Sequence, residues 1–154
     1  MRNGIIIIKK PTGAVRKDVN RLIGSLSLTA TSPRPLSVAQ FRDLIAQKNV
    51  FLLAVVLKEG LEWQMIGFLT LYLVRIPSGI VGVTEDLLVD ERYRKWGIGR
   101  ALMEHAILLA EKKGARHLSL RTNPIRIEAN KLYEQMGFHL MTTNFYRMNL
   151  PRKK

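Results

Sequence analysis

The sequence contains no cysteine, which excludes disulfide bonds, a catalytic thiolate and a cysteine-ligated zinc site together. Histidine is scarce as well. His105, His117 and His139 have neither the spacing of metal ligands nor an acidic partner pattern such as His-Glu-x-x-His. The sequence therefore predicts no metal site, and the missing cysteines fit a cytoplasmic location.

Long apolar runs are also missing. The longest run without a charge, Gln64 to Val74, is about half of the ~20 residues that a membrane-spanning helix needs. The run Ile5 to Ile8 is shorter than the ~7 to 15 apolar residues of a signal-peptide core, and it lacks a small-residue cleavage site. We therefore expect a soluble, unprocessed protein with no membrane partner.

Acidic residues are few: 12 Asp and Glu stand against 25 Lys and Arg, for a formal net charge of +13. This balance favours polyanionic partners, namely nucleic acid, phosphorylated cofactors or an acidic protein surface. The basic residues are scattered, so a solvated basic surface explains much of the excess equally well. Aromatic residues make up only 7% of the chain and no RNA-binding signature occurs, which argues against a dedicated nucleic-acid-binding module.

The composition is otherwise that of an ordinary globular protein, with 47% hydrophobic and 24% charged residues in a chain of 154. This length is enough to bury a core. We expect one domain over residues 1–154, with a frayed basic tail at 151–154.

Several patterns predict the elements of the first part of the chain. The β-branched run Ile5 to Ile8 predicts a strand covered on both faces. Apolar residues at helical spacing predict a helix from Thr12 to Leu26, which Ser32 to Pro35 breaks. Ser37, with Gln40 three residues later, forms a capping box that begins a second helix.

Three strands follow, Val50 to Leu57, Trp63 to Val74 and Ile80 to Val89. Their short connections predict an antiparallel meander. The later elements are a helix from Arg100 to Lys113, a strand from His117 to Arg121, a helix from Ile125 to Met136, and one or two strands within Phe138 to Leu150. The strand–helix–strand crossover requires parallel pairing, so we expect a mixed sheet.

The stretch Arg94 to Gly99 links a strand to a helix through two glycines. Unpaired amides at a helix start, together with the positive end of the helix dipole, bind phosphate groups. A Rossmann fingerprint would need glycine at Leu102 and an acidic residue about 20 residues later, and neither is present. A P-loop would need Gly-Lys-Ser/Thr, which does not occur.

Two motifs between Val81 and Leu150 resemble those of the GNAT (GCN5-related) N-acetyltransferase superfamily. Glu85-Asp86-Leu87-Leu88-Val89, followed by Arg-x-x-Gly-x-Gly at Arg94 to Gly99, resembles the family's motif A. Ala129-x-x-Leu132-Tyr133-x-x-x-Gly137-Phe138 resembles motif B. The chain departs from many relatives at Arg126, where they have asparagine. The resemblance implies an α/β (α+β) fold, a single domain whose central mixed, mostly antiparallel sheet of roughly six to seven strands is flanked by four helices.

The resemblance also implies acetyl-CoA as the co-substrate. In such proteins the strand that holds Leu87 to Val89 diverges from the next parallel strand, and backbone groups near Leu88 polarise the thioester. The amides from Lys95 to Arg100 would take the pyrophosphate. The implied cofactor-binding residues are Leu87, Leu88, Val89, Arg94, Lys95, Trp96, Gly97, Ile98, Gly99, Arg100, Arg126 and Asn130.

Two residues are implied for catalysis. Tyr133 resembles the family's general acid, which protonates the departing thiolate, although its spacing also fits a core aromatic. Glu85 stands where one branch of the family helps to deprotonate the amine, often through water, although a salt-bridged strand residue fits equally well. Strand alternation directs Asp86 to the opposite face, and we expect Tyr146 to pack in the last strand.

The expected reaction is direct attack of a primary amine on the thioester in a ternary complex. The net charge disfavours polyamines, so we expect a protein or peptide amine, or a small amine with an anionic group. The alternatives are a non-catalytic basic module that binds nucleic acid or a ribosomal partner, and an acyl-CoA-binding relative without catalysis. Both a monomer and a homodimer are compatible with the sequence.

Overall fold

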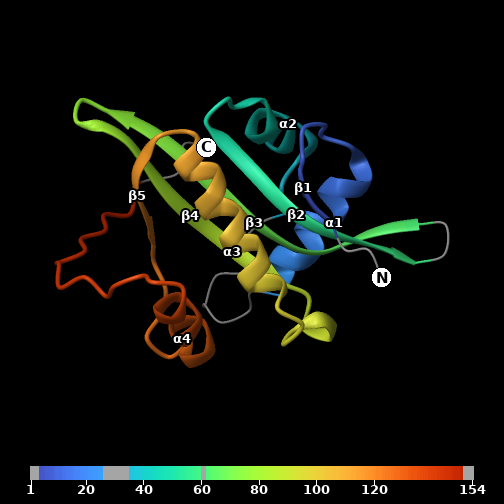
Figure 1. The fold of residues 1–154 in the computed structure, drawn as a ribbon. Helices are drawn as coiled ribbons and strands as arrows, with labels where there is room; N and C mark the ends of the chain where they lie inside the picture. Colours follow the sequence, from blue (N-terminus) through green and yellow to red (C-terminus); the bar gives the residue numbers. More distant parts are fainter. Residues whose placement is uncertain (1–3, 26–34, 60–61, 151–154) are drawn as a thin grey trace. The chain divides into compact units, whose positions relative to one another are not determined.

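The computed structural model describes residues 4–25, 35–59 and 62–150 (Figure 1). These residues form β1 (Gly4–Ile7), α1 (Gly13–Gly24), α2 (Val38–Ala46), β2 (Val50–Glu59), β3 (Glu62–Ile76), β4 (Gly79–Val89), the 3₁₀ turn η1 (Glu91–Tyr93), α3 (Ile98–Lys112), β5 (Ala115–Leu120) and α4 (Ile127–Gln135). The predicted helix end at Leu26, most of the break at Ser32 to Pro35, and the basic tail lie outside the described residues.

The five strands form one sheet in the order β1-β2-β3-β4-β5. The first three pairs are antiparallel, and β4 pairs with β5 in parallel, with α3 as the crossover. The predicted meander and mixed sheet are therefore confirmed. Short turns leave the meander strands no other pairing, and the helical crossover brings the chain back to the end of the sheet where β4 began, so that β5 runs parallel to β4.

The prediction that the first strand is covered on both faces is wrong. β1 is an edge strand that pairs only with β2, and its residues alternate between exposed and half-buried. Ile6, for example, is 43% exposed, whereas Ile8, just after the strand, is buried. A run of β-branched residues indicates a strand, but it does not show whether that strand lies at the centre or at the edge of its sheet.

The strands predicted within residues 138–150 are also absent, because this described segment contains no helix or strand. The described chain therefore has five strands instead of six to seven. A strand forms only where a neighbouring strand takes its peptide hydrogen bonds, and no pairing involves these residues. Their apolar side chains are exposed; Leu140 is 93% and Tyr146 86% exposed, so Tyr146 does not pack as expected.

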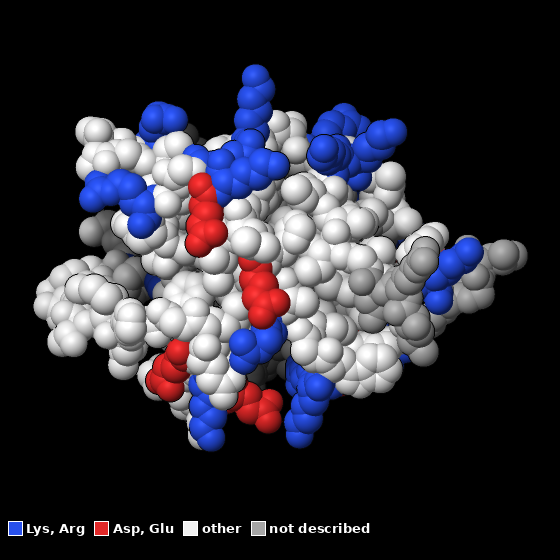
Figure 2. Space-filling view, viewed as in Figure 1, with Lys and Arg blue, Asp and Glu red and all other residues white. Residues whose placement is uncertain are grey.

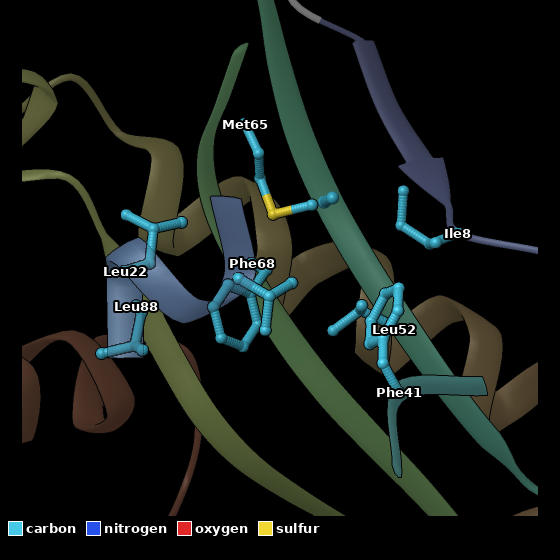
Figure 3. Close-up of a cluster of buried hydrophobic side chains, with 9 residues drawn as sticks. Ile8, Leu22, Phe41, Leu52, Met65, Phe68 and Leu88 are labelled. Atoms are coloured by element: carbon cyan, nitrogen blue, oxygen red, sulfur yellow. The ribbon is translucent and has the colours of Figure 1, made fainter. Parts of the chain in front are cut away.

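Buried side chains cover both faces of the sheet. On one face, Leu22 of α1 and Phe41 of α2 pack with Leu52 of β2 and Phe68 of β3 in a single cluster (Figure 3). On the other face, α3 crosses the sheet (Figure 1) and buries Leu102, Met103, Ala106 and Ala110. The helices bury one stripe each, as the helical spacing of their apolar residues predicts.

Local signals set the helix ends. Ser37 Oγ accepts the Gln40 backbone N–H at 3.2 Å, and Gln40 Oε1 accepts the Ser37 N–H at 2.9 Å, which confirms the capping box. Gly114 and Gly137 follow α3 and α4 with φ of 76° and 87°, the left-handed conformation that glycine adopts without strain.

The chain forms two compact units, Met1–Arg121 and Thr122–Lys154. The first contains the whole sheet with α1, α2 and α3, and the second contains α4. The single domain expected over residues 1–154 stays a prediction. Among the described residues, no helix is both long and apolar enough to span a bilayer.

Candidate active site

The loop between β4 and α3 has an unusual backbone. Lys95 and Gly97 have φ of 67° and 75°, both in the left-handed region. This conformation is strained for lysine and rare outside turns. Alternating left- and right-handed residues turn successive amides toward the same side, which makes an anion-binding concavity.

Helix α3 begins directly after this loop, and its N-terminus has no side-chain cap, because the capping residue is Gly97. The first intrahelical bond runs from the Ala101 N–H to the Gly97 carbonyl, at 3.0 Å. The amides of Ile98 and Gly99 precede that bond, so the helix itself provides no acceptor for them. The predicted uncapped helix start is therefore present, and its binding of a phosphate stays a prediction.

Side chains around the loop are mostly exposed. Tyr93 is the buried anchor, and Trp96 packs edge-on against it with ring centroids 5.5 Å apart. Arg94, predicted as an anion contact, forms an ion pair with Glu91 at 3.1 Å. A ligand phosphate would have to compete with Glu91 for this guanidinium.

Strand β4 has an open edge next to the loop. Its pairing with β5 ends at Thr84 and Leu120, whereas its pairing with β3 continues to Leu88 and Val89. Asp90 donates its backbone N–H to the Ile66 carbonyl at 2.9 Å. Because peptide groups alternate along a strand, those of Val89 point away from β3, toward the edge where β5 has ended. The structure thus leaves the peptide groups of Val89 available at this edge, within the range Leu87 to Val89 where thioester binding was predicted.

A bulge interrupts β4 at Asp86. Thr70 pairs with Glu85 and Phe68 with Leu88, so two β4 residues lie opposite one β3 residue, and Asp86 has φ of 54°. Alternation does not hold across a bulge. Alternation therefore does not determine the face of Asp86 relative to Glu85, and the predicted opposite face stays a prediction.

The acidic side chains at the bulge influence one another and their neighbour on β3. Asp86 is an exposed residue. Its carboxyl is nevertheless partly desolvated by the surrounding protein, which raises its pKa, and the negative charge of Glu85 raises that pKa further. Burial, followed by the charges of Asp86 and Glu85, raises the pKa of Tyr72. Both carboxylates therefore lie within electrostatic range of the Tyr72 hydroxyl.

Glu85 lies where β4 and β5 separate, and it is bound to Arg121. Arg121 Nη2 donates to Glu85 Oε1 at 2.5 Å, with the Glu85 side chain one-third exposed. The salt-bridged strand residue that the sequence left open is thus observed. The role of Glu85 as a base stays a prediction, and it requires Arg121 to release the carboxylate.

Sequence reasoning missed Asp90, which lies directly after β4 and is only 7% exposed. Its carboxylate accepts hydrogen bonds from Arg21 of α1 and from the side chain and backbone of Arg92. The Arg92 hydrogen bonds, above all, lower the pKa of Asp90, so it is ionised at neutral pH. The one local signal was an aspartate at the start of a turn, a preferred capping residue.

The remaining predicted site residues lie in the second unit. Tyr133, on α4, is half-buried and packs edge-on against Phe138. Burial raises its pKa, and the charge of Arg126 offsets part of that increase. Asn130 Nδ2 donates to the carbonyls of Asn123 and Arg126 at 3.1 and 2.9 Å. Asn130 therefore holds the turn before α4, and its predicted cofactor contact is untested.

The family model described as the acetyltransferase (GNAT) family matches residues 14–138. This chain belongs to the GNAT family. The match includes the glycine loop, the open strand edge and α4, so the predicted family and fold class are confirmed. Among solved structures, the ribosomal-protein-alanine N-acetyltransferase of Brucella melitensis biovar Abortus 2308 shares the fold, with a TM-score of 0.80 at 19% identity over 99% of this chain and 100% of that one.

Curated relatives are similar over shorter stretches. The ribosomal protein bS18-alanine N-acetyltransferase of Escherichia coli K12 is 40% identical over 63 residues, which are 40% of this chain and 43% of that protein. The streptothricin acetyltransferase of Streptomyces lavendulae is 43% identical over 54 residues, 35% of this chain and 29% of that protein. The chain thus matches less than half the length of each of these two relatives.

Proposed function

We propose that this GNAT protein is an acetyl-CoA-dependent N-acetyltransferase that acts by direct attack of a primary amine in a ternary complex. One observation carries the proposal. The open edge of β4 at Leu87 to Val89 leads within a few residues to the uncapped start of α3. The strand edge offers peptide donors and acceptors for the amide-bearing arm of acetyl-CoA, and the helix start offers amide donors for its pyrophosphate. The two binding elements follow one another in the same order as these two parts of acetyl-CoA.

Backbone groups do most of the binding in this proposal. The amides of Gly97 to Gly99 hold the pyrophosphate at the positive end of the α3 dipole. The peptide groups of Val89 bond the pantetheine arm, and an N–H near Leu88 polarises the thioester carbonyl, as in an oxyanion hole. Acetyl-CoA supplies the activated acetyl group; the chain orients it and stabilises the developing negative charge.

In this proposal Glu85 accepts a proton and Tyr133 donates one. The amine loses a proton, directly or through water, to Glu85, and its nitrogen attacks the thioester carbon. The carbon–sulfur bond then breaks, and the thiolate takes the hydroxyl proton of Tyr133. A phenol whose pKa is raised by burial keeps its proton at neutral pH, which is the state that a general acid requires.

For the acceptor we propose the N-terminal amine of a protein or peptide, with a small anionic amine as the second candidate. Two relatives that share sequence or fold with this chain carry names that specify a ribosomal-protein alanine. The net charge of +13 repels polyamines over a long range. Glu85 and Asp86 place negative charge locally in this otherwise basic chain, and this local charge suits a single protonated amine.

The test combines acetyl-CoA binding with an acceptor panel. A thermal-shift assay with acetyl-CoA should raise the melting temperature, because a ligand that binds only the folded state stabilises it. Release of the CoA thiol should then occur with peptides that carry a free N-terminal amine, and not with the same peptides after N-terminal blocking. Saturable turnover of spermidine with no turnover of peptides or anionic amines would overturn the acceptor class.

A non-catalytic basic module is the second candidate function, because Lys and Arg side chains form several separate groups on the face shown in Figure 2, with fewer acidic ones among them. A nucleic-acid mobility shift with a steep salt dependence, and no acetyl-CoA binding, would favour it. Acetyl-CoA binding without any transfer would instead indicate a relative that has lost catalysis.

A further inference from the structure

Asp90 occupies the junction between the two halves of the proposed acetyl-CoA site. It follows Val89, the last residue of β4, and precedes η1, which leads into the glycine loop. Its backbone N–H bonds the Ile66 carbonyl, and its carbonyl accepts the Tyr93 N–H, each at 2.9 Å. This one residue therefore holds both the strand behind it and the turn ahead of it.

The carboxylate of Asp90 connects this junction to α1. Arg21 Nη1 donates to Asp90 Oδ2 at 2.5 Å, and Arg21 Nη2 donates to the Met65 carbonyl on β3 at 2.6 Å. Arg92 Nη2 donates to the same Asp90 oxygen at 3.0 Å. With an exposed fraction of 7%, Asp90 is a buried charge paired on two sides, an arrangement that fixes geometry strongly.

A second acidic residue, Asp18 of α1, bonds α1 to Met65 of β3. Asp18 Oδ2 accepts the Met65 backbone N–H at 3.0 Å, so Asp18 and Arg21 together bond both peptide groups of Met65. The Arg21–Asp90 hydrogen bond joins α1 to the residue that follows β4, and the two residues lie 69 positions apart in the sequence.

The loop that follows needs such an anchor. It contains two residues with positive φ, Lys95 and Gly97, and its side chains are largely exposed. A strained, exposed loop relaxes unless its ends are fixed. The direction of its amides therefore depends on the residues that hold η1, and Asp90 caps η1 directly through the Arg92 N–H.

We propose that Asp90 and Arg21 are positioning residues that set the affinity of this protein for the pyrophosphate part of acetyl-CoA. The inference rests on the proposed function, because it concerns the same site. Neither side chain touches the co-substrate in this proposal. They hold η1 so that the amides of the loop and of the α3 start converge on one anion.

A merely structural role would also make these residues important for stability, so the test compares two substrates. Acetyl-CoA carries the pyrophosphate, and S-acetylpantetheine has the same thioester without it. For Asp90→Asn we expect kcat/KM with acetyl-CoA to fall by about 10-fold to 100-fold, because even a small displacement of the amides that bind the pyrophosphate lowers the rate strongly. The kcat/KM with S-acetylpantetheine should remain close to the wild-type value.

Two further variants separate a positioning role from a general loss of stability. Val19→Ala removes a buried side chain of α1 without touching the network, so it should lower stability and change both substrates alike. Arg21→Gln is the milder change, since Arg21 is partly exposed. If the pair acts as a unit, Arg21→Gln/Asp90→Asn should lose no more acetyl-CoA selectivity than the more damaging single variant.

The outcomes separate the two proposals. Equal losses with acetyl-CoA and S-acetylpantetheine in Asp90→Asn, or independent effects in the double variant, would overturn the positioning role and leave the acetyltransferase proposal intact. Calorimetric binding of CoA and pantetheine gives the same comparison without turnover. If the wild-type protein binds neither molecule, both proposals are overturned.

Discussion

The proposed proton donor is a single phenol, and its environment suits the task. Burial raises the pKa of Tyr133, so its hydroxyl is protonated at neutral pH and available to the departing thiolate. We expect Tyr133→Phe to lower kcat by about 100-fold or more, with little change in acetyl-CoA affinity. Steady-state kinetics with a binding assay would check this.

The exposed Tyr146 provides the control, because Tyr146→Phe also removes one hydroxyl from a residue of the second unit. We expect wild-type turnover from this variant. Unchanged turnover in Tyr133→Phe would show that another group protonates the thiolate.

Gly97 offers a test of the loop with a matched control. Its φ is 75°, and an added Cβ would meet no atom within 4 Å. Gly114 has φ of 76° and equally open space, but it lies at the far end of α3. Both Gly97→Ala and Gly114→Ala should cost about 1 to 2 kcal/mol of unfolding free energy, since an L-residue is strained there.

Only Gly97→Ala should also weaken acetyl-CoA binding, measured by calorimetry, because only Gly97 lies beside the proposed anion site. Equal affinity in the two variants would argue against pyrophosphate binding at the start of α3.

At the residue scale, the sequence was most informative where a role depends on local backbone. The sequence placed Gly97 in the turn that leads into a helix, and its φ of 75° is a conformation that glycine adopts without strain. Asp90 was missed because its partner on α1, Arg21, is distant in the sequence, and no local pattern indicates which aspartate binds a distant arginine.

Helix α1 and the end of β4 are connected by charge, which makes their connection dependent on pH. Hydrogen bonds from Arg92 and Arg21 lower the pKa of Asp90 in the folded protein. Its contribution to stability is therefore complete above the ordinary Asp pKa of about 3.9 and is lost as the pH falls toward the lowered value.

We expect Asp90→Asn to destabilise the protein at neutral pH by on the order of 3 kcal/mol, as when a buried ion pair loses one partner. The unfolding free energy of wild type should fall more steeply between about pH 5 and pH 2 than that of the variant. Urea titrations across this range would check the difference. Parallel pH curves for the two proteins would show that Asp90 does not titrate as described.

Elements with a clear period were predictable, and elements defined by their neighbours were not. The helical spacing in α1, α2 and α3 and the short turns of the meander indicated those elements correctly. The first strand was predicted to be covered on both faces, and one or two strands were predicted within 138–150. The exposure of the first strand and the unpaired state of 138–150 both depend on segments elsewhere in the chain. The alternation of residues along β4 in the sequence does not indicate the bulge at Asp86.

The whole molecule carries a net charge of +13, and this should influence the co-substrate more than the thioester chemistry. Acetyl-CoA is polyanionic, and its attraction to a basic protein is screened by salt. We expect its dissociation constant to rise as salt increases from about 0.05 to 0.5 M, whereas that of the uncharged S-acetylpantetheine should stay nearly constant. The same salt dependence for both would show that the charge has no part in binding.

At this scale the sequence predicted the family, the mixed sheet and the element order from β1 to α4, because two motifs and the alternation of strands and helices are local properties. The chain forms two compact units that meet at Arg121 in the sequence, and the single domain expected over residues 1–154 stays a prediction. The loop, the open edge and Glu85 lie in the first unit, and Tyr133 lies in the second.

The most direct test of the central proposal follows an isotopically labelled acetyl group from acetyl-CoA. The protein is incubated with labelled acetyl-CoA and a panel of peptides with free N-terminal amines, and the products are mapped by mass spectrometry. We predict labelled acetyl on the N-terminal nitrogen of at least one peptide, with one CoA thiol released for each acetyl group transferred. Tight binding of acetyl-CoA with no label on any peptide or small amine would contradict the proposal.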